Sequence, residues 1–273
     1  MATARSKGIA IDEALARKNL NQIVTVYKQV AEAALQGDMP AGNFVTAGYV
    51  LSALAAEHRP LDKISAALTH LIAGLQMSDG RWLAVQPSRP PMEDSIVSQT
   101  AMAVRTLTLY PIPGEKARFE LTIRRAQSWL IGVNPATTEE RNMRLMGLAW
   151  TKATPQILHE ASRQVVGQQR PDGGWPQLPN TPPDAYGTGT SLYALHEAGM
   201  AVTDEPYRKG VAFLLKTQYQ SGAWFVKTRS YPAQPYFESG FPFGHNQWIS
   251  AAGTGWASLA VANTLPNLKR NRD

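Results

Sequence analysis

One seven-residue pattern occurs three times in the chain and constrains the fold more than any other feature. It reads QMSDGRW at residues 76–82, QRPDGGW at 169–175 and QYQSGAW at 218–224. In each copy a Gln is followed four residues later by Gly and six residues later by Trp. Because the chain contains only 7 Trp, three of them in one frame indicate a repeated structural unit.

Each copy follows an amphipathic segment, so the pattern predicts a turn at the end of a helix. We expect the Gly to adopt a positive φ and the Asp of the first two copies to bond the turn backbone. The Gln side chain is expected to bond main-chain groups left free at a helix end. The Trp is expected to bury its ring and to place its indole N–H in the same network. These roles are structural and require no catalysis.

Segments of two kinds alternate along the chain. Apolar residues at three-and-four spacing, with charges between them, predict half-exposed helices over 12–35, 62–76, 115–132, 154–168 and 205–217. Segments poorer in charge and richer in Ala, Gly and Thr predict buried helices over 45–57, 97–109, 140–152, 188–198 and 250–263. The alternation predicts an all-α chain in which exposed and buried helices form about five pairs.

The composition bounds the class of protein. With 273 residues, of which 44% are hydrophobic and 18% charged, we expect one globular domain over 1–273 with flexible ends at 1–10 and 266–273. The absence of Cys excludes disulfides, thiol catalysis and Cys-ligated zinc. The net charge of +6 comes from scattered residues, which favours a solvated surface over a nucleic-acid partner. No signal peptide or membrane span is predicted, so the chain is expected to be soluble as written, in a compartment that the sequence leaves open.

The fullest copy of the repeat resembles a known motif. The segment KGVAFLLKTQYQSGAW, Lys209 to Trp224, is similar to the QW motif of the squalene-hopene and oxidosqualene cyclase family. A partial copy stands at 125–130, with Asn134 at the place of the Gln, and the resemblance covers most of residues 61–265. It implies the family's α/α toroid, a barrel of about five to six helical hairpins in inner and outer layers. It also implies an apolar isoprenoid or similar lipid as ligand, and no cofactor.

The same resemblance bears on catalysis. Class II members of that family protonate an alkene or epoxide with an Asp of a DxDD-T pattern at the start of an inner helix. The matching segment here, 184–188, keeps Asp184 but has Tyr186 at the place of the proton donor, so the acid cluster is not preserved. Asp184 is therefore either a catalytic acid or a helix N-cap, where the helix dipole would lower the pKa of its carboxyl.

Three loops rich in Pro and Gly join the repeated turns to the next buried helix, at 88–95, 179–187 and 227–247. We expect them to gather at one end of the molecule and to carry the functional residues. The candidate catalytic residues are Asp184, Glu238, His245, Asp94 and Tyr186. The candidate substrate-binding residues are Glu93, Tyr236, Phe237, Phe241, Trp248 and Trp256. The alternative for the last loop is that its aromatic residues only cover the open end of the barrel, while Glu238 and His245 bond each other or the backbone.

Two functions remain open. One is an enzyme that cyclises or isomerises an isoprenoid, motivated by the fold resemblance and by the aromatic loop. The other is a non-catalytic module whose cavity or rim binds a lipid or a partner protein, motivated by the missing acids and by a length sufficient for one of the family's two helical domains. Peripheral membrane contact and a partner domain fit either function. The zinc-dependent prenyltransferase β subunits have a similar fold, but their metal ligands include a Cys, so no metal is expected here.

Overall fold

The structure is a computed structural model that describes residues 1–38, 43–83, 89–232 and 235–268. These residues form eleven α-helices, one short 3-10 helix and no strand, so the predicted all-α class is confirmed. The α-helices are α1 (Ala2–Ser6), α2 (Glu13–Leu35), α3 (Asn43–Ala56), α4 (Lys63–Gly74), α5 (Ile96–Leu109), α6 (Lys116–Gly132), α7 (Thr138–Trp150), α8 (Pro155–Val166), α9 (Ala185–Glu197), α10 (Glu205–Thr217) and α11 (Gln247–Ala262). Among them, none is both long and apolar enough to cross a bilayer.

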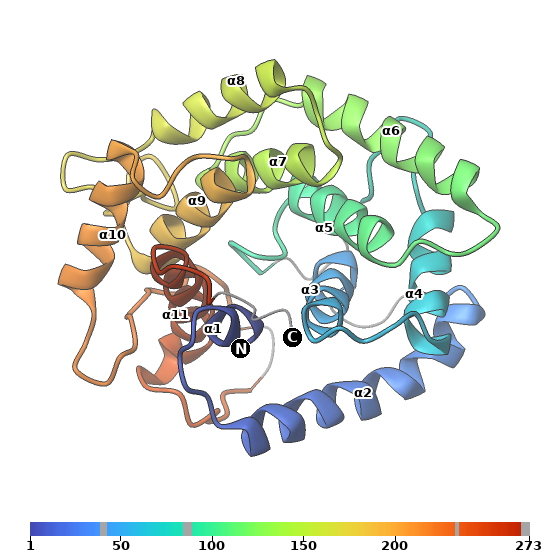
Figure 1. Cartoon of the computed structure of the whole chain (residues 1–273), viewed down its shortest axis with the longest axis horizontal. Coiled ribbons are helices and arrows are strands. Elements are labelled where there is room, and N and C mark those ends of the chain that lie inside the picture. The colour runs from blue at the N-terminus through green and yellow to red at the C-terminus, as the bar shows by residue number, and fades with distance from the viewer. Residues whose placement is uncertain (39–42, 84–88, 233–234, 269–273) are drawn as a thin grey trace.

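The helices lie in two layers. Figure 1 shows α2, α4, α6, α8 and α10 following one another round the outside, with α3, α5, α7, α9 and α11 within. Each inner helix from α3 to α9 packs against the next inner helix, and α4, α6, α8 and α10 each also contact the inner helix that follows. The inner layer corresponds to the segments predicted to be buried and the outer layer to the amphipathic ones. The alternation in the sequence therefore predicted the layers correctly.

The three repeated turns use one set of hydrogen bonds to attach the layers. Each indole N–H donates to the carbonyl of the residue ten positions earlier, at 2.7 to 2.8 Å. Each Trp main-chain N–H donates to a Thr hydroxyl of the next inner helix, at 2.9 to 3.1 Å. These acceptors are Thr100, Thr188 and Thr254. The Trp thus joins the end of an outer helix to the inner helix that follows.

In the first two turns the Gln and Gly also lie against the next outer helix. In all three turns the Gln Nε2 donates to the Gly carbonyl four residues later, at 2.9 to 3.0 Å. Gln169 Nε2 also reaches the Pro206 carbonyl on α10 at 2.9 Å, and Gln76 makes the same bond to α6. Gly173 has a φ of +90°, and a Cβ there would lie 2.4 Å from the Lys209 carbonyl oxygen. The roles predicted for Gln, Gly and Trp are confirmed.

The hairpin of α6 and α7 lacks the repeated turn, and Arg144 supplies the missing donor. In the other turns, the residue whose carbonyl accepts the indole N–H lies four positions before the Gln. Leu130 has the same position relative to Asn134. The Leu130 carbonyl accepts from Arg144 Nε at 2.7 Å, and the Ile131 carbonyl accepts from Arg144 Nη2 at 3.0 Å. A guanidinium from the inner helix therefore replaces an indole N–H from the turn, which the sequence pattern did not predict.

The two ends of the chain pack against the body of the protein. Arg5 of α1 pairs with Glu57, just after α3, at 2.7 Å, and Leu268 N donates to the Ser6 carbonyl at 2.9 Å. Helix α1 also contacts α11. The first and last hairpins are thereby connected through segments 1–10 and 266–268, for which the sequence predicted flexibility; residues 269–273 lie outside the described residues.

Candidate functional site

The three Pro- and Gly-rich loops meet at one end of the molecule, as expected. Arg229 Nε donates to Gln177 Oε1 at 2.8 Å, which joins the third loop to the second. Ser230 Oγ donates to the Pro90 carbonyl at 2.8 Å, which joins the third loop to the first. Because these loops lead into α5, α9 and α11, the end where they meet is that of the inner-helix N-termini.

A cavity of about 510 Å³ opens among these loops, and we call it the aromatic cavity. It brings together five of the residues predicted from the sequence, which are Glu93, Tyr236, Phe237, His245 and Trp248. The Phe237 and Trp248 rings lie 5.0 Å apart, and the Tyr236 and His245 rings 4.4 Å apart, measured between ring centroids. Tyr231 and four prolines complete much of the remaining wall. The arrangement offers a ligand several aromatic faces and few polar groups.

A second cavity of about 630 Å³ adjoins it, with Thr228 in the wall of both. We call it the Arg229 cavity, since Arg229, Lys227 and Gln177 contribute its polar wall. Its apolar wall includes Tyr219 and Phe225, whose rings both contact Phe243. This cavity contains Asp184, so the structure separates Asp184 from the aromatic cavity.

Asp184 is the N-cap of α9, which confirms the structural alternative for this residue. Its Oδ1 accepts from Gly187 N at 2.8 Å, and its Oδ2 accepts from Gln177 Nε2 at 2.7 Å. The pKa of the Asp184 carboxyl is nevertheless raised, because burial outweighs these hydrogen bonds and the charge of Arg229. The hydrogen bonds at the helix terminus lower this pKa as expected, but burial, which the sequence did not show, raises it by more. With both oxygens bonded to protein donors, Asp184 has a complete structural role.

Glu139 is an acid that the sequence analysis missed. It is the second residue of α7, and its side chain is buried with 5% relative exposure. Its Oε2 accepts from the Tyr186 hydroxyl at 3.1 Å, whereas its Oε1 has no hydrogen-bond partner in the described part of the chain. Burial raises the pKa of the Glu139 carboxyl to about 8, although the Tyr186 bond and Arg229 lower it. Tyr186, expected at the place of a proton donor, therefore donates to a carboxyl of the neighbouring inner helix.

The sequence contained one signal for this site, namely an acidic pair at the start of a buried helix. Glu140 and Thr137 form a capping box, with Glu140 N donating to Thr137 Oγ1 at 3.2 Å. Glu139 is the same residue type as Glu140 and lies next to it, so the sequence predicts an ordinary first-turn acid at both positions. Only the burial of one of the two distinguishes them, and burial is a property of the assembled fold.

Aromatic side chains of three inner helices contact one another. The ring of Trp256 on α11 lies 6.1 Å from Tyr49 on α3 and 5.0 Å from Tyr193 on α9, between centroids. Trp256, predicted to bind substrate, is therefore part of this group rather than of the aromatic cavity. The Tyr49 hydroxyl oxygen is buried and has no partner within the described residues. Burial, and after it the charge of Glu139, raises the pKa of Tyr49 well above its usual value.

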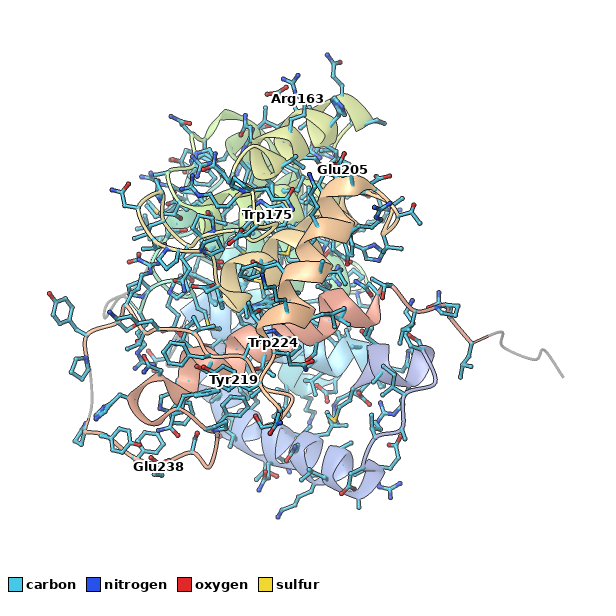
Figure 2. The ribbon with its side chains drawn as sticks, turned by 90° about the vertical axis from the view of Figure 1, so that its left-hand side faces the viewer. Arg163, Trp175, Glu205, Tyr219, Trp224 and Glu238 are labelled. Atoms are coloured by element: carbon cyan, nitrogen blue, oxygen red, sulfur yellow. The ribbon has the colours of Figure 1, made fainter. Side chains whose placement is uncertain are left out.

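Besides Tyr186 and Trp256, three predicted site residues lie outside the described walls of both cavities, namely Glu238, Asp94 and Phe241. Glu238 is exposed and accepts a hydrogen bond from the Tyr236 hydroxyl. Figure 2 shows Glu238 at the outer edge of the molecule, whereas Trp175 and Trp224 lie within the helical body. Asp94 is exposed. Phe241 is partly buried, and its main-chain N–H donates to Ser239 Oγ. Tyr236 stands between Glu238 and His245, so these two are linked through an aromatic ring rather than by a direct bond.

Comparison with known protein families gives no assignment, since no family model matches the chain. Within the described ranges, no group of three or more His, Asp or Glu side chains is positioned to hold a metal ion. The two cavities and the buried Glu139 are the features of the described structure that bear on function.

Proposed function

We propose that this chain is an α/α toroid that binds an apolar small molecule of the isoprenoid type in the aromatic cavity. The toroid is supported by the two layers of helices, by the repeated turns and by the contacts between the first and last hairpins. The observation that carries the binding function is the set of exposed aromatic rings around one cavity. Tyr231, Tyr236, Phe237 and Trp248 are 93%, 49%, 50% and 51% exposed.

The energetics of such a surface favour an apolar ligand. Large apolar side chains gathered at one place on a surface commonly mark a binding site. A ligand that covers them gains about 25 cal/mol for each Å² of apolar area removed from water. The cavity volume of about 510 Å³ lies in the range of small-molecule sites. The aromatic faces also suit the alkene groups of an isoprenoid chain, which are weakly polar and pack well on rings.

Titration with farnesol and geranylgeraniol tests this function. Binding is measured by calorimetry and by quenching of Trp fluorescence, because Trp248 lines the cavity. We expect Phe237→Ala to weaken binding about tenfold, which corresponds to roughly 1.4 kcal/mol of lost ring contact. Phe225→Ala is the matched control, since Phe225 is exposed to a similar degree (41%) but lines the Arg229 cavity. Absence of binding, or an equal loss in the two variants, would overturn the assignment to the aromatic cavity.

Acid–base isomerisation of the bound molecule is a second candidate, favoured by Glu139. A carboxyl with a pKa of about 8 is protonated at neutral pH and exchanges its proton readily near that pH. Such an acid is weak, which favours isomerisation beside a carbonyl over protonation of an isolated alkene. Farnesal incubated in deuterated buffer should then gain deuterium above the uncatalysed rate, and Glu139→Gln should abolish the gain. An uncatalysed rate in the presence of the wild-type protein would leave binding as the sole function.

A further inference from the structure

The Arg229 cavity has two cations in its wall that form no ion pair within the described part of the chain. Lys227 and Arg229 both line the cavity. The ion pairs of the described residues include neither of them. The side chain of Arg229 makes one hydrogen bond there, from Nε to Gln177 Oε1 at 2.8 Å. Two cations without an acidic partner beside a cavity indicate a site for an anion.

Gln177 holds the guanidinium of Arg229 in place. Gln177 is buried, with 4% relative exposure. Its amide Nε2 donates to Asp184 Oδ2 at 2.7 Å, and its amide Oε1 accepts from Arg229 Nε. The two Nη groups of Arg229 have no hydrogen-bond partner among the described residues, and neither is a fully buried atom. They can therefore donate together to the two oxygens of one carboxylate, in the forked geometry that arginine favours.

Aromatic rings supply much of the apolar wall of this cavity. Tyr219 and Phe225 are 54% and 41% exposed, and their rings lie 5.2 and 5.5 Å from that of Phe243, between centroids. Phe213 and Trp224, which are buried, line the same cavity. A ligand that covers the exposed rings gains from the removal of apolar area from water. The cavity volume of about 630 Å³ is in the range of small-molecule sites and gives room for a ring-sized apolar body.

The charges of the wall select the kind of anion. The charged side chains that line the cavity are Lys227, Arg229 and Asp184. With Asp184 ionised, one positive charge is left unbalanced, and a single carboxylate neutralises it. A phosphate dianion would exceed that charge and would lie in the same cavity as the Asp184 carboxylate. An uncharged ligand gains nothing from the attraction of either cation.

We propose that the Arg229 cavity binds an apolar monocarboxylic acid, with its carboxylate on Arg229 and Lys227. The apolar body of the acid lies against Tyr219 and Phe225. This is a second site, separate from the aromatic cavity, and it goes beyond the binding of an isoprenoid. Its existence does not depend on that function.

A series of ligands with one ring system and different polar groups tests the inference. The probes β-naphthoate, β-naphthalenemethanol and β-naphthyl phosphate are titrated by calorimetry into the wild-type protein, Lys227→Gln and Arg229→Gln. We expect the wild-type protein to bind the carboxylate about tenfold more tightly than the alcohol. Each variant should lose most of that preference with its affinity for the alcohol unchanged. Lys28→Gln is the matched control and should keep the preference, because Lys28 is an exposed lysine on α2 that lines neither cavity.

Thermal unfolding of the free variants checks that they fold. Lys227→Gln removes no hydrogen bond or ion pair of the described residues, so it carries the test if Arg229→Gln is unstable. Phe225→Ala should weaken binding of the carboxylate, and Phe237→Ala, in the aromatic cavity, should not.

Several results would overturn the inference. They are equal wild-type affinity for the carboxylate and the alcohol, tightest binding of the phosphate, no binding of any probe, and a preference that survives in Lys227→Gln or is lost equally in Lys28→Gln. An equal loss in Phe225→Ala and Phe237→Ala would also overturn it, since the acid would then not be specific to the Arg229 cavity. Failure of farnesol to bind would refute the isoprenoid function and leave this site standing, so the two proposals can fail separately.

Discussion

Glu139 couples the stability of the protein to pH, and Glu139→Gln measures that coupling. Burial raises the pKa of its carboxyl from 4.5 to about 8. Below pH 4.5 the carboxyl is protonated in both the folded and the unfolded state, so its contribution does not vary with pH. Between pH 4.5 and about pH 8 the unfolded chain releases the proton and the folded chain retains it. The free energy of unfolding therefore falls as pH rises through this window and levels off above it.

The size of the effect follows from the difference between the two pKa values. At about 1.4 kcal/mol per pKa unit, the change from 4.5 to about 8 corresponds to at most about 5 kcal/mol. For a chain of this length, 1 kcal/mol changes the unfolding temperature by roughly 2 to 4 °C. The unfolding temperature of the wild-type protein should thus fall by about 10 to 20 °C between pH 4.5 and about pH 8 through this residue alone. A Gln side chain has nearly the same shape, can accept the Tyr186 hydrogen bond through its amide oxygen, and does not titrate.

The assay is urea and thermal unfolding of the wild-type protein and Glu139→Gln at pH 5, 6, 7, 8 and 9, with results expressed as the difference between the two at each pH. We expect Glu139→Gln to gain several kcal/mol relative to wild type between pH 5 and pH 8, and no more beyond. The buried Asp184 also has a raised pKa, but it is present in both proteins and cancels in the difference. Glu120→Gln, which removes an exposed carboxyl on α6, is the control and should follow the wild type.

A difference that stays constant from pH 5 to pH 8 would refute this reasoning. It would mean that the Glu139 carboxyl is already ionised at neutral pH, through hydration or a cationic partner. The proposed isomerisation requires the protonated form of Glu139, so it would lose its basis.

Three further predictions concern the contacts that attach the helices. Gly173→Ala should destabilise the protein by more than about 3 kcal/mol, since its Cβ would meet a carbonyl oxygen at 2.4 Å. At Gly222 the φ is +81° and the nearest atom to an added Cβ is Gln218 Nε2 at 4.0 Å, so Gly222→Ala should cost about 1 kcal/mol. The midpoints of urea unfolding compare the two variants. Arg144→Met leaves two helix-end carbonyls without their donor and should lower the free energy of unfolding by about 3 kcal/mol. The control Arg163→Met changes an exposed side chain and should lower it by less than about 0.5 kcal/mol. Thr188→Val removes the acceptor of a buried Trp N–H and should cost about 1 to 3 kcal/mol, with Thr188→Ser restoring part of it.

The helices and the repeated turns were predictable because their causes are local. The period of apolar residues lies within each segment, so α2 to α11 were predicted with ends within a few residues of those observed. The turn combines a positive φ at Gly with bonds between residues four and ten positions apart. Features of this kind involve residues close together in the sequence, so a short stretch is enough to predict them. The loops were also predicted to meet, because they all precede inner helices.

The buried acid was not predictable, because its distinguishing property is not local. Glu139 and Glu140 are adjacent acids at the start of the same helix, and only one is buried. The partner of Glu139 is Tyr186, 47 residues away. Arg144 likewise has a role only because α7 packs on the end of α6. Glu139 and Arg144 both belong to the hairpin of α6 and α7, which lacks the Trp turn. The pattern shared by the other hairpins therefore gives no signal for these two residues.

The sequence by itself determined the order of the helices, which of them are inner, and how three of the outer helices end. Only the tertiary structure decided which groups surround the two cavities, and which acid holds its proton at neutral pH. The physical reason is that helix formation depends on residues within one or two turns. Burial, desolvation and the pKa shifts that follow depend on segments brought together from afar, such as Ser230 and Pro90, 140 positions apart.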